Sequence, residues 1–396
     1  MSRFLPGNDI RLLVCGEQYF PALEAAIDLA RHEIFLETYI FADDSIGERI
    51  AAALARAARR GVRVRILVDG FGAREFETTH RVALETAGAH TLIFRPDISW
   101  VTLRRNRLRR MHRKLAVIDA STGFAGGINI IDDMHTPGHT PPRFDFAVQV
   151  RGPLVARMHA ECQKLWERVA WATLQFRPRL PRLREYANRQ AGQIRATLLV
   201  RDNLRHRRDI EDAYLEAING ARSDIIIANA YFLPGRRFRQ ALVRAAERGV
   251  TVTLILQGRV EYLLMHYASQ ALYGALLSKG VRIVEYRRSF MHAKAAVVDD
   301  DWATVGSSNI DPFSLMLARE ANVVVSDAGF TRELRQKLLQ AASHGGRELR
   351  HRQWKNRPMT ERVLRWMAYG MVRVMIGLAG DLLARRRAGR DTRHNL

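Results

Sequence analysis

The sequence predicts an α/β protein built from two duplicated halves. Two observations lead to this prediction: a strand–helix–strand pattern occurs twice in the same order, and a pair of motifs recurs with identical spacing. A strand, a helix and a strand in succession form a βαβ unit, whose strands pair in parallel within an α/β layer. Two such units indicate a duplication.

The repeated pattern covers Ile34–Gly70 and Ile225–Gly258. In each copy an apolar, β-rich stretch ends at an aromatic pair, and an Ala/Arg-rich helix with a 3.6-residue apolar period follows. The helix stops at a glycine, and a second buried strand comes next. The aromatic pairs are Tyr39 with Phe41 and Tyr231 with Phe232, the glycines are Gly61 and Gly249, and the second strands are 62–68 and 250–256.

The length of 396 residues is too great for one ordinary core. The segment 176–194 is rich in arginine, contains two prolines and separates the two copies, so it is predicted to be a linker. The predicted organisation is a first half at 1–175, the linker at 176–194, a second half at 195–345 and a basic amphipathic C-terminal segment at 346–396.

The composition narrows the class of protein. A net charge of +22 favours binding to polyanions, either nucleic acid or an anionic membrane surface, and charge alone does not choose between them. The two cysteines, Cys15 and Cys162, have no metal-ligand spacing and favour a reducing compartment. We expect neither a secretory signal nor a transmembrane helix, because no stretch of about 20 residues lacks charge.

Two His-x-Lys-x₄-Asp motifs, each followed by a glycine and an asparagine, carry the chemistry. His and Asn are 17 residues apart in both copies, and two of the six lysines in the chain lie two positions after a histidine. Such a repeated coincidence indicates a shared function. The first motif contains His112, Lys114, Asp119 and Asn129, and the second contains His292, Lys294, Asp299 and Asn309.

Strand alternation places the His and Lys of each motif on one face, where they can meet a phosphate. We expect the two lysines and two asparagines to surround the phosphate oxygens. One imidazole would attack phosphorus while the other protonates the leaving oxygen, and the symmetry leaves open which does which. Asp119 and Asp299 belong to the catalytic motifs, but strand alternation directs them to the opposite face from the His and Lys. We therefore interpret them as structural.

Each histidine needs an acid to fix its tautomer. Asp145 follows the first motif and Glu320 follows the second, each at the start of a hydrophobic strand, and each is predicted to orient the histidine of its own half. His135 and His139 lie in a Pro/Gly loop without further ligands, so no metal is expected there. The proposed chemistry also requires no cofactor.

These residues resemble the phospholipase D superfamily, whose signature is two such His-Lys-Asp motifs. The resemblance implies two α/β halves, each a mixed sheet flanked by helices, packed about a pseudo-twofold axis. It also implies two-step transfer through a phosphohistidine, with His112 as the nucleophile and His292 as the general acid and base.

Further segments look like bacterial cardiolipin synthases, from about residue 8 to about residue 340, and most like the B type. One departure is Ala318-Arg319 before Glu320. The resemblance implies that two phosphatidylglycerols give cardiolipin and glycerol, at the cytoplasmic face of the bacterial cell membrane, by a peripheral protein. The segments are Glu17-Gln-Tyr19, Leu36-Glu37-Thr38, Met111–Lys114, Asn229–Phe232, Glu285–Arg288 and Val305–Pro312.

Two segments suit an anionic phospholipid membrane. The stretch Phe94–Arg113 crowds arginines, Arg113 among them, against apolar residues. In the C-terminal segment, apolar residues recur at helical spacing with Arg365, Arg373 and Asp381 on the other side, which favours a helix lying in the membrane interface over a spanning helix or one packed on the enzyme. The apolar residues are Leu364, Met367, Ala368, Met371, Met375, Leu378, Ala379 and Leu382.

Other functions fit parts of the same pattern. Another phosphatidyltransferase or a hydrolase of this superfamily would use the same motifs with a different donor or acceptor. A nuclease would be favoured by the basic charge, but the amphipathic C-terminal segment argues against it, and no nucleic-acid partner is expected. A non-catalytic binding protein would have no need of two complete motifs.

Overall fold

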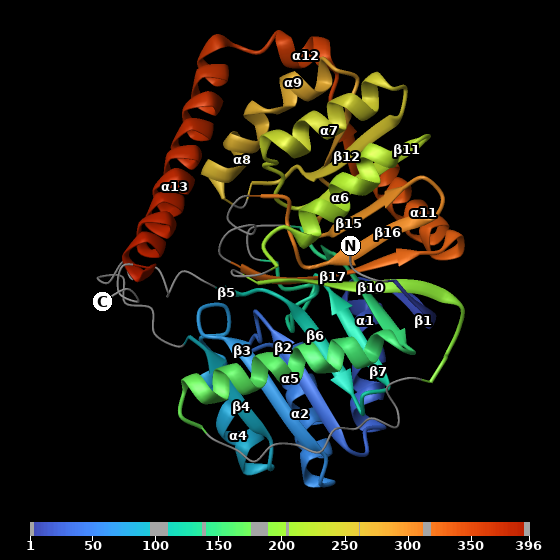
Figure 1. Cartoon of the computed structure of the whole chain (residues 1–396), viewed down its shortest axis with the longest axis vertical. Helices are drawn as coiled ribbons and strands as arrows, with labels where there is room; N and C mark the ends of the chain where they lie inside the picture. Colours follow the sequence, from blue (N-terminus) through green and yellow to red (C-terminus); the bar gives the residue numbers. More distant parts are fainter. Residues whose placement is uncertain are drawn as a thin grey trace.

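The computed structural model shows two α/β halves with a long helix beside them (Figure 1). It describes residues 4–95, 110–136, 140–175, 189–202, 206–260, 262–311 and 318–391, with side chains up to residue 375 in the last range. Each half contains a sheet with helices on both sides, so the predicted fold class is confirmed.

The first half begins with a strand and ends with a long helix. Its elements are β1 (Leu5–Val14), α1 (Cys15–Asp28), β2 (Glu33–Thr38), α2 (Ser45–Arg59), β3 (Arg63–Asp69), α3 (Phe76–Thr79), α4 (Arg81–Thr86), β4 (His90–Phe94), β5 (Arg110–Met111), β6 (Lys114–Ile118), β7 (Thr122–Gly126), β8 (Arg143–Phe144), β9 (Phe146–Arg151) and α5 (Leu154–Ala172).

The second half repeats this order, continues through β18 and α12, and is followed by the long helix α13. Its elements are β10 (Ile194–Arg201), α6 (Asp209–Gly220), β11 (Asp224–Asn229), α7 (Arg236–Glu247), β12 (Thr251–Gln257), α8 (Leu263–Ala271), α9 (Tyr273–Leu277), β13 (Arg282–Tyr286), β14 (Phe290–Met291), β15 (Lys294–Val298), β16 (Trp302–Gly306), β17 (Ala318–Ser326), α11 (Ala328–Gly345), β18 (Gly346–Glu348), α12 (His351–Lys355) and α13 (Met359–Asp391).

The strand order shows the duplication directly. β1 and β10 pair antiparallel where the halves meet. Outward from this pair the order is β9, β7, β6, β2, β3, β4 in the first half and β17, β16, β15, β11, β12, β13 in the second. The strands correspond one to one, with β2–β3–β4 and β11–β12–β13 parallel, as the predicted βαβ units require. The halves are therefore related by a pseudo-twofold axis.

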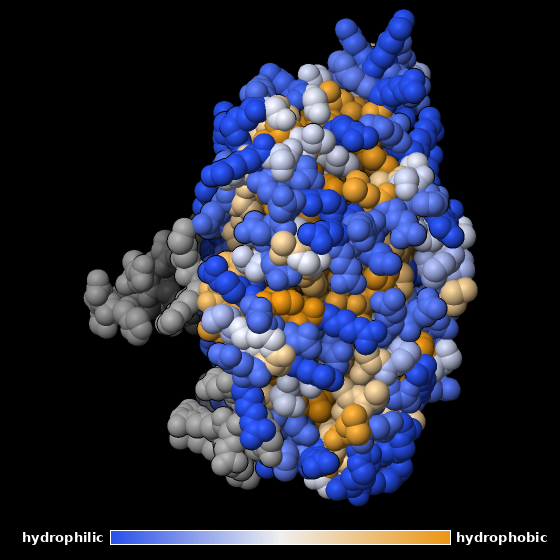
Figure 2. Space-filling view, turned by 90° about the vertical axis from the view of Figure 1, so that its right-hand side faces the viewer, coloured by the Kyte–Doolittle hydropathy of each residue, from blue (hydrophilic) through white to orange (hydrophobic). Residues whose placement is uncertain are grey.

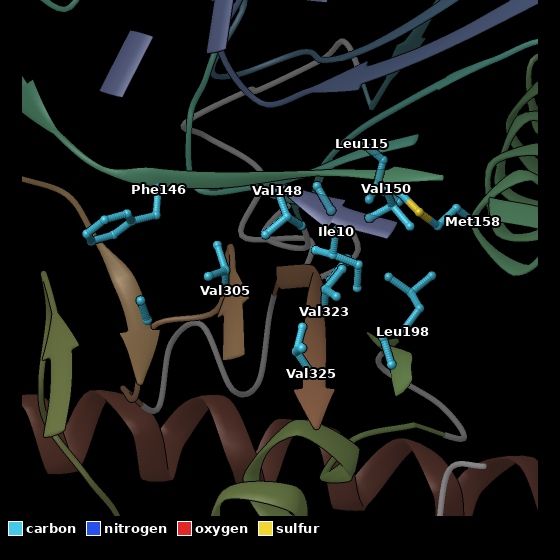
Figure 3. Packing of buried hydrophobic residues seen from close by; sticks show 14 of the residues in the cluster. Ile10, Leu115, Phe146, Val148, Val150, Met158, Leu198, Val305, Val323 and Val325 are labelled. Carbon is cyan, nitrogen blue, oxygen red and sulfur yellow. The ribbon is translucent and has the colours of Figure 1, made fainter. Parts of the chain in front are cut away.

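The core between the halves is apolar and continuous. Valines of β9, such as Val148 and Val150, face valines of β16 and β17, such as Val305 and Val323 (Figure 3). Helices α5 and α11 join this core, whereas α1 and α2 cover the outer face of the first sheet and α6 and α7 that of the second. β-Branched residues on buried strands produce this packing because they fill a pleated surface well. The interface therefore holds the two halves in one fixed arrangement.

The predicted helix stops and strands are confirmed. Gly61 and Gly249 follow α2 and α7 with φ of +86° and +90°, a conformation that costs glycine little. The predicted boundary at residue 345 is wrong, because β18 pairs with β13 and Trp354 of α12 packs 5.3 Å from Tyr273. The second half thus continues through α12. Of the predicted linker, 176–188 lies outside the described residues.

The C-terminal helix α13 runs along α8 (Figure 1). Ala368 and Val372 are buried against Ala268 and Leu272. Arg365 is also buried, and its Nε donates to Gln270 Oε1 at 2.9 Å, so its predicted place on the solvent side was wrong. The rest of the predicted apolar face points away from the enzyme up to residue 375. Among the described helices, none is both long enough and apolar enough to cross a bilayer.

Candidate active site

The two motif histidines lie beside short strand pairs that cross between the halves. β5 pairs in parallel with β17, and β14 pairs in parallel with β8. The backbone N–H of His112 donates to Arg319 O at 2.9 Å, and that of His292 donates to Phe144 O at 2.8 Å. Each histidine is therefore held by the backbone of the opposite half, next to that half's acid.

The imidazole–carboxylate pairs are crossed in the same way. Nδ1 of His112 lies 3.1 Å from both carboxylate oxygens of Glu320, and Nδ1 of His292 lies 2.7 Å from Asp145 Oδ2. The predicted pairing within each half was wrong, because the acid on each strand lies opposite the histidine of the other half. With Nδ1 bound to the acid, Nε2 of each ring is left for chemistry.

The two lysines share the site with the histidines. Lys114 Nζ donates to His112 O at 2.7 Å, and Lys294 Nζ donates to His292 O. Lys294 Nζ also lies 4.0 Å from Asp145 Oδ2. Both lysines are buried, and burial lowers the pKa of Lys114 to about 7. An anionic phosphate would raise that pKa again, because it favours the charged ammonium.

The pKa values of the two acids are shifted in opposite directions. Burial raises the pKa of Asp145 to about 7. Burial acts on Glu320 as well, but His112, Lys114 and a hydrogen bond from Ser307 outweigh it and lower the pKa of that carboxyl. Burial lowers the pKa of both histidines, most strongly that of His292, where Lys294 adds to the effect. The Glu320 pair thus holds an anion, whereas the Asp145 pair can hold a proton.

The two motif asparagines are buried but differ in their contacts. Asn129 Oδ1 accepts a hydrogen bond from Ile40 N at 3.1 Å. Asn309 Oδ1 has no partner among the described residues, and the N–H of the next residue, Ile310, donates to Asn229 Oδ1. Phosphate binding by these asparagines stays a prediction.

The carboxylates of Asp119 and Asp299 both bond to backbone N–H groups, which fits the structural role predicted for them. The carboxylate of Asp119 accepts from the backbone N–H groups of residues 31–33 at 2.8 Å each. Asp299 accepts from the backbone of residues 222–224 at 2.8–3.1 Å and from the Ser223 hydroxyl at 2.8 Å. Both residues have positive φ, +50° and +47°, which aspartate tolerates better than most residues. They fasten the turns that lead into β2 and β11.

Sequence reasoning missed Ser307 and Tyr39. Ser307 Oγ donates to Glu320 Oε2 at 2.5 Å, whereas the equivalent residue in the first half is Gly127. A Cβ at Gly127 would overlap the Asp145 carboxylate, so the two positions are not interchangeable. The ring of Tyr39 lies 4.9 Å from that of His112. Two features of the sequence could have revealed them. The first motif has Gly126-Gly127 where the second has Gly306-Ser307, and an aromatic residue, Tyr39, directly follows β2.

The predicted basic segment before the first motif is only partly described. Residues 96–109 lie outside the described residues, as does His139. Arg113 was expected at a lipid surface, but it is 1% exposed, pairs with Glu37 and donates to Glu161 O at 2.9 Å. Arg113 is therefore part of the core, because it points away from the face that carries His112.

Two crossed imidazole–carboxylate pairs and two buried lysines on a duplicated α/β fold define an enzyme of phospholipase D type. The family model described as "Cardiolipin synthase, PLD-like domain" matches residues 23–166 and 214–341. The chain is 42% identical over 343 residues to cardiolipin synthase B of Escherichia coli (strain K12), covering 84% of this chain and 80% of that protein. It therefore belongs to the cardiolipin synthase family of phospholipase D-like proteins.

Two more distant similarities agree with this family assignment and with the fold. Cardiolipin synthase A of Pseudomonas entomophila is 30% identical over 87% of this chain and 70% of its own length. The crystal structure of phosphatidylserine synthase from Haemophilus influenzae superposes with a TM-score of 0.71 at 13% identity, covering 94% of this chain and 96% of that one. This structural similarity supports the fold.

Asp299→Ala is expected to lower the free energy of unfolding by about 2 kcal/mol, because three backbone N–H groups and a hydroxyl lose a charged acceptor. Asp299→Asn keeps an acceptor and tolerates the positive φ, so we expect about half that loss. Urea unfolding measures both, and the activity of the folded fraction should stay within about twofold of wild type. Full stability with lost catalysis would instead make Asp299 a participant in the reaction.

Proposed function

We propose that the protein is a cardiolipin synthase that transfers a phosphatidyl group from one phosphatidylglycerol to another, giving cardiolipin and glycerol through a phosphohistidine. The observation that carries this proposal is the crossed pair of imidazoles, each with its own carboxylate and lysine. Two imidazoles in different protonation states supply both a nucleophile and an acid without any other group.

The first step would begin at His112. Its Nε2 lone pair attacks the phosphorus of the donor phosphatidylglycerol, the bond from phosphorus to the glycerol oxygen breaks, and His292 gives that oxygen its proton. In the second step His292 removes a proton from a primary hydroxyl of the second phosphatidylglycerol. That oxygen attacks phosphorus and His112 leaves, so one phosphodiester is exchanged for another.

The pKa values of the two carboxylates support the assignment of His112 as the nucleophile and His292 as the general acid. Glu320 remains an anion, so the His112 pair carries no extra proton and its Nε2 is free to attack. Asp145 has a pKa of about 7, so the His292 pair holds one proton that can shift to the imidazole when an anionic diester binds. Lys114 and Lys294 would neutralise the charge that builds on the phosphoryl oxygens.

The membrane contact proposed for this protein is the outer face of α13. This face exposes large apolar side chains, each 46–62% exposed, over three turns. They are Val363, Leu364, Trp366, Met367, Met371, Val374 and Met375. The side of the molecule opposite α13 is mostly hydrophilic (Figure 2). An apolar helix face bordered by arginines suits an anionic bilayer, in which this face would lie in the interface.

The same contact would place the active site near its lipids. α13 packs on α8, and Tyr262, which precedes α8, lies 5.9 Å from Tyr231 and close enough to Tyr39 to affect its ionisation. Tyr39 in turn contacts His112. We propose peripheral attachment at the cytoplasmic face, which the two free cysteines and the negative charge of the inner leaflet support.

Purified protein should form cardiolipin and glycerol from phosphatidylglycerol vesicles, as measured by mass spectrometry. His112→Ala and His292→Ala are each expected to lower the rate at least about 10³-fold, because the nucleophile or the acid is lost. Wild type should also form an acid-labile phosphoenzyme that His112→Ala lacks. Phosphatidic acid as the main product would indicate a hydrolase, and cleaved oligonucleotides would indicate a nuclease.

The pH dependence follows from Lys114 and Asp145, whose pKa values both lie near 7 in the empty site. Both groups must hold a proton for the first step, so kcat/KM should fall as the pH rises through about 7. A bound diester anion favours the protonated forms, so the corresponding fall in kcat should lie at higher pH. A kcat/KM that is constant from pH 6 to 9 would contradict this assignment.

Met367→Glu/Met371→Glu is expected to weaken binding to phosphatidylglycerol vesicles at least about tenfold, because two apolar side chains no longer enter the interface. Vesicle co-sedimentation measures binding, and activity in detergent micelles with dispersed lipid should be retained. Val82→Glu, at an exposed apolar residue on α4, is the matched control and should bind as wild type does. Unchanged binding of the double variant would exclude α13 as the contact.

A further inference from the structure

The twofold symmetry of the active site is broken at the residues that pair with the two acids, Asp145 and Glu320, on the neighbouring strand. In the first half Cys15 N donates to Asp145 O at 2.9 Å, at the end of the β1–β9 pairing. In the second half the residue directly opposite Glu320 in the β10–β17 pairing is Arg201. Cys15 and Arg201 therefore occupy equivalent places, one neutral and one cationic. Burial raises the pKa of the Cys15 thiol to about 12, so it stays uncharged.

Arg201 is fully buried, and among the residues that the structure describes none of its three guanidinium nitrogens has a hydrogen-bond partner. Residues directly opposite in an antiparallel pair project to the same side of the sheet, so its side chain lies on the side of Glu320. Glu320, Asp311 and Glu211 act on it electrostatically. Burial lowers the pKa of Arg201 only to about 10, so it remains charged near neutral pH. A buried cation that finds no hydrogen bond in the described part of the chain is costly, which points to a role for its charge beside Glu320.

We propose that Arg201 is a positioning residue that keeps Glu320 anionic, so that His112 enters the reaction without an extra proton. The charge of Arg201 and the hydroxyl of Ser307 both act on the second-half acid, and the first half has Cys15 and Gly127 at these places. Asp145 therefore keeps its ability to hold a proton for His292. The inference rests on the proposed function and explains how similar motifs divide the two roles.

Other charged groups around the pair do not remove the effect. Lys114 and Lys294 also face His112, and Lys114 acts on Glu320. Lys114 acts on both acids, whereas Lys294 Nζ lies 4.0 Å from Asp145 Oδ2 and lowers the pKa of Asp145, so the lysines do not explain why Glu320 is the more acidic of the two. Arg201 lies directly opposite Glu320 on the neighbouring strand β10, so its charge acts on Glu320. The difference between the halves thus includes Arg201 and Ser307 near Glu320, and Asp133, whose charge raises the pKa of Asp145.

The test compares Arg201→Gln, which removes the charge, with Arg201→Lys, which keeps it. Loss of a nearby cation raises the affinity of the Glu320–His112 pair for a proton. In Arg201→Gln the acidic limb of kcat/KM should therefore move up by about one pH unit, and activity at low pH should fall about tenfold. In Arg201→Lys the limb should stay near its wild-type position. Arg248→Gln, whose guanidinium donates to two backbone oxygens of the same half, is the control for losing one arginine.

A second variant and a second substrate separate the role of Arg201 from a folding defect and from a failure of the proposed lipid reaction. Arg201→Met replaces the charge with an apolar chain of similar length and serves if the Gln variant does not fold, as judged by circular dichroism and thermal unfolding. Rates are taken on phosphatidylglycerol vesicles and on bis(p-nitrophenyl) phosphate. If wild type cleaves only the second substrate, the proposed lipid reaction fails while the position of the acidic limb still tests Arg201. An unmoved limb in folded Gln or Met variants, or a loss of activity equal at all pH values, would overturn the role of Arg201.

Discussion

The crossed contact between the histidine of one half and the acid of the other is the constraint on which the molecule depends. His112 bonds to the backbone and carboxylate of β17, and His292 bonds to those of the β8–β9 segment. Neither half pairs its own motif histidine with its own acid. The apolar interface of β9, β16 and β17 must therefore hold the halves in one fixed arrangement, since small displacements would break both pairs at once.

A symmetric scaffold here supports an asymmetric reaction. The backbone repeats closely, down to the positive φ of Asp119 and Asp299 and the bridges of Phe41 with Ile130 and Phe232 with Ile310. The side chains behind the acids do not repeat. The second half has a glutamate, Glu320, beside Ser307, whereas the first half has an aspartate, Asp145, beside Gly127. Because transfer needs one group without a proton and one with a proton, this difference matters more than the symmetry.

The position of α13 links the chemistry to its surroundings. Its inner face is fixed to α8 by Ala368, Val372 and the buried Arg365, while its outer face leaves apolar side chains in contact with solvent. A face of this kind is unfavourable in water and favourable at a lipid interface. Since α8 borders the aromatic residues near His112, the surface proposed to meet the membrane and the site proposed to use its lipids lie on the same side of the molecule.

Sequence alone determined the features that follow from local periodicity and spacing. The duplicated βαβ units, the glycine stops, the shared face of His and Lys and the separate role of the motif aspartates all depend on neighbours within a few residues. Their physical basis is the two-residue repeat of a strand and the 3.6-residue repeat of a helix. The motifs and the hydrophobic strands that follow them also supplied all four residues of the two imidazole–carboxylate pairs.

Only the tertiary structure decided which of these residues meet. Periodicity within a strand states which way a side chain points but not which strand lies opposite, so the crossing of Asp145 to His292 and Glu320 to His112 was out of reach. For the same reason Arg365 was placed on the wrong side of α13: its burial depends on a partner, Gln270, 95 residues away in the chain. Contacts between distant segments depend on packing, and packing is a property of the whole fold.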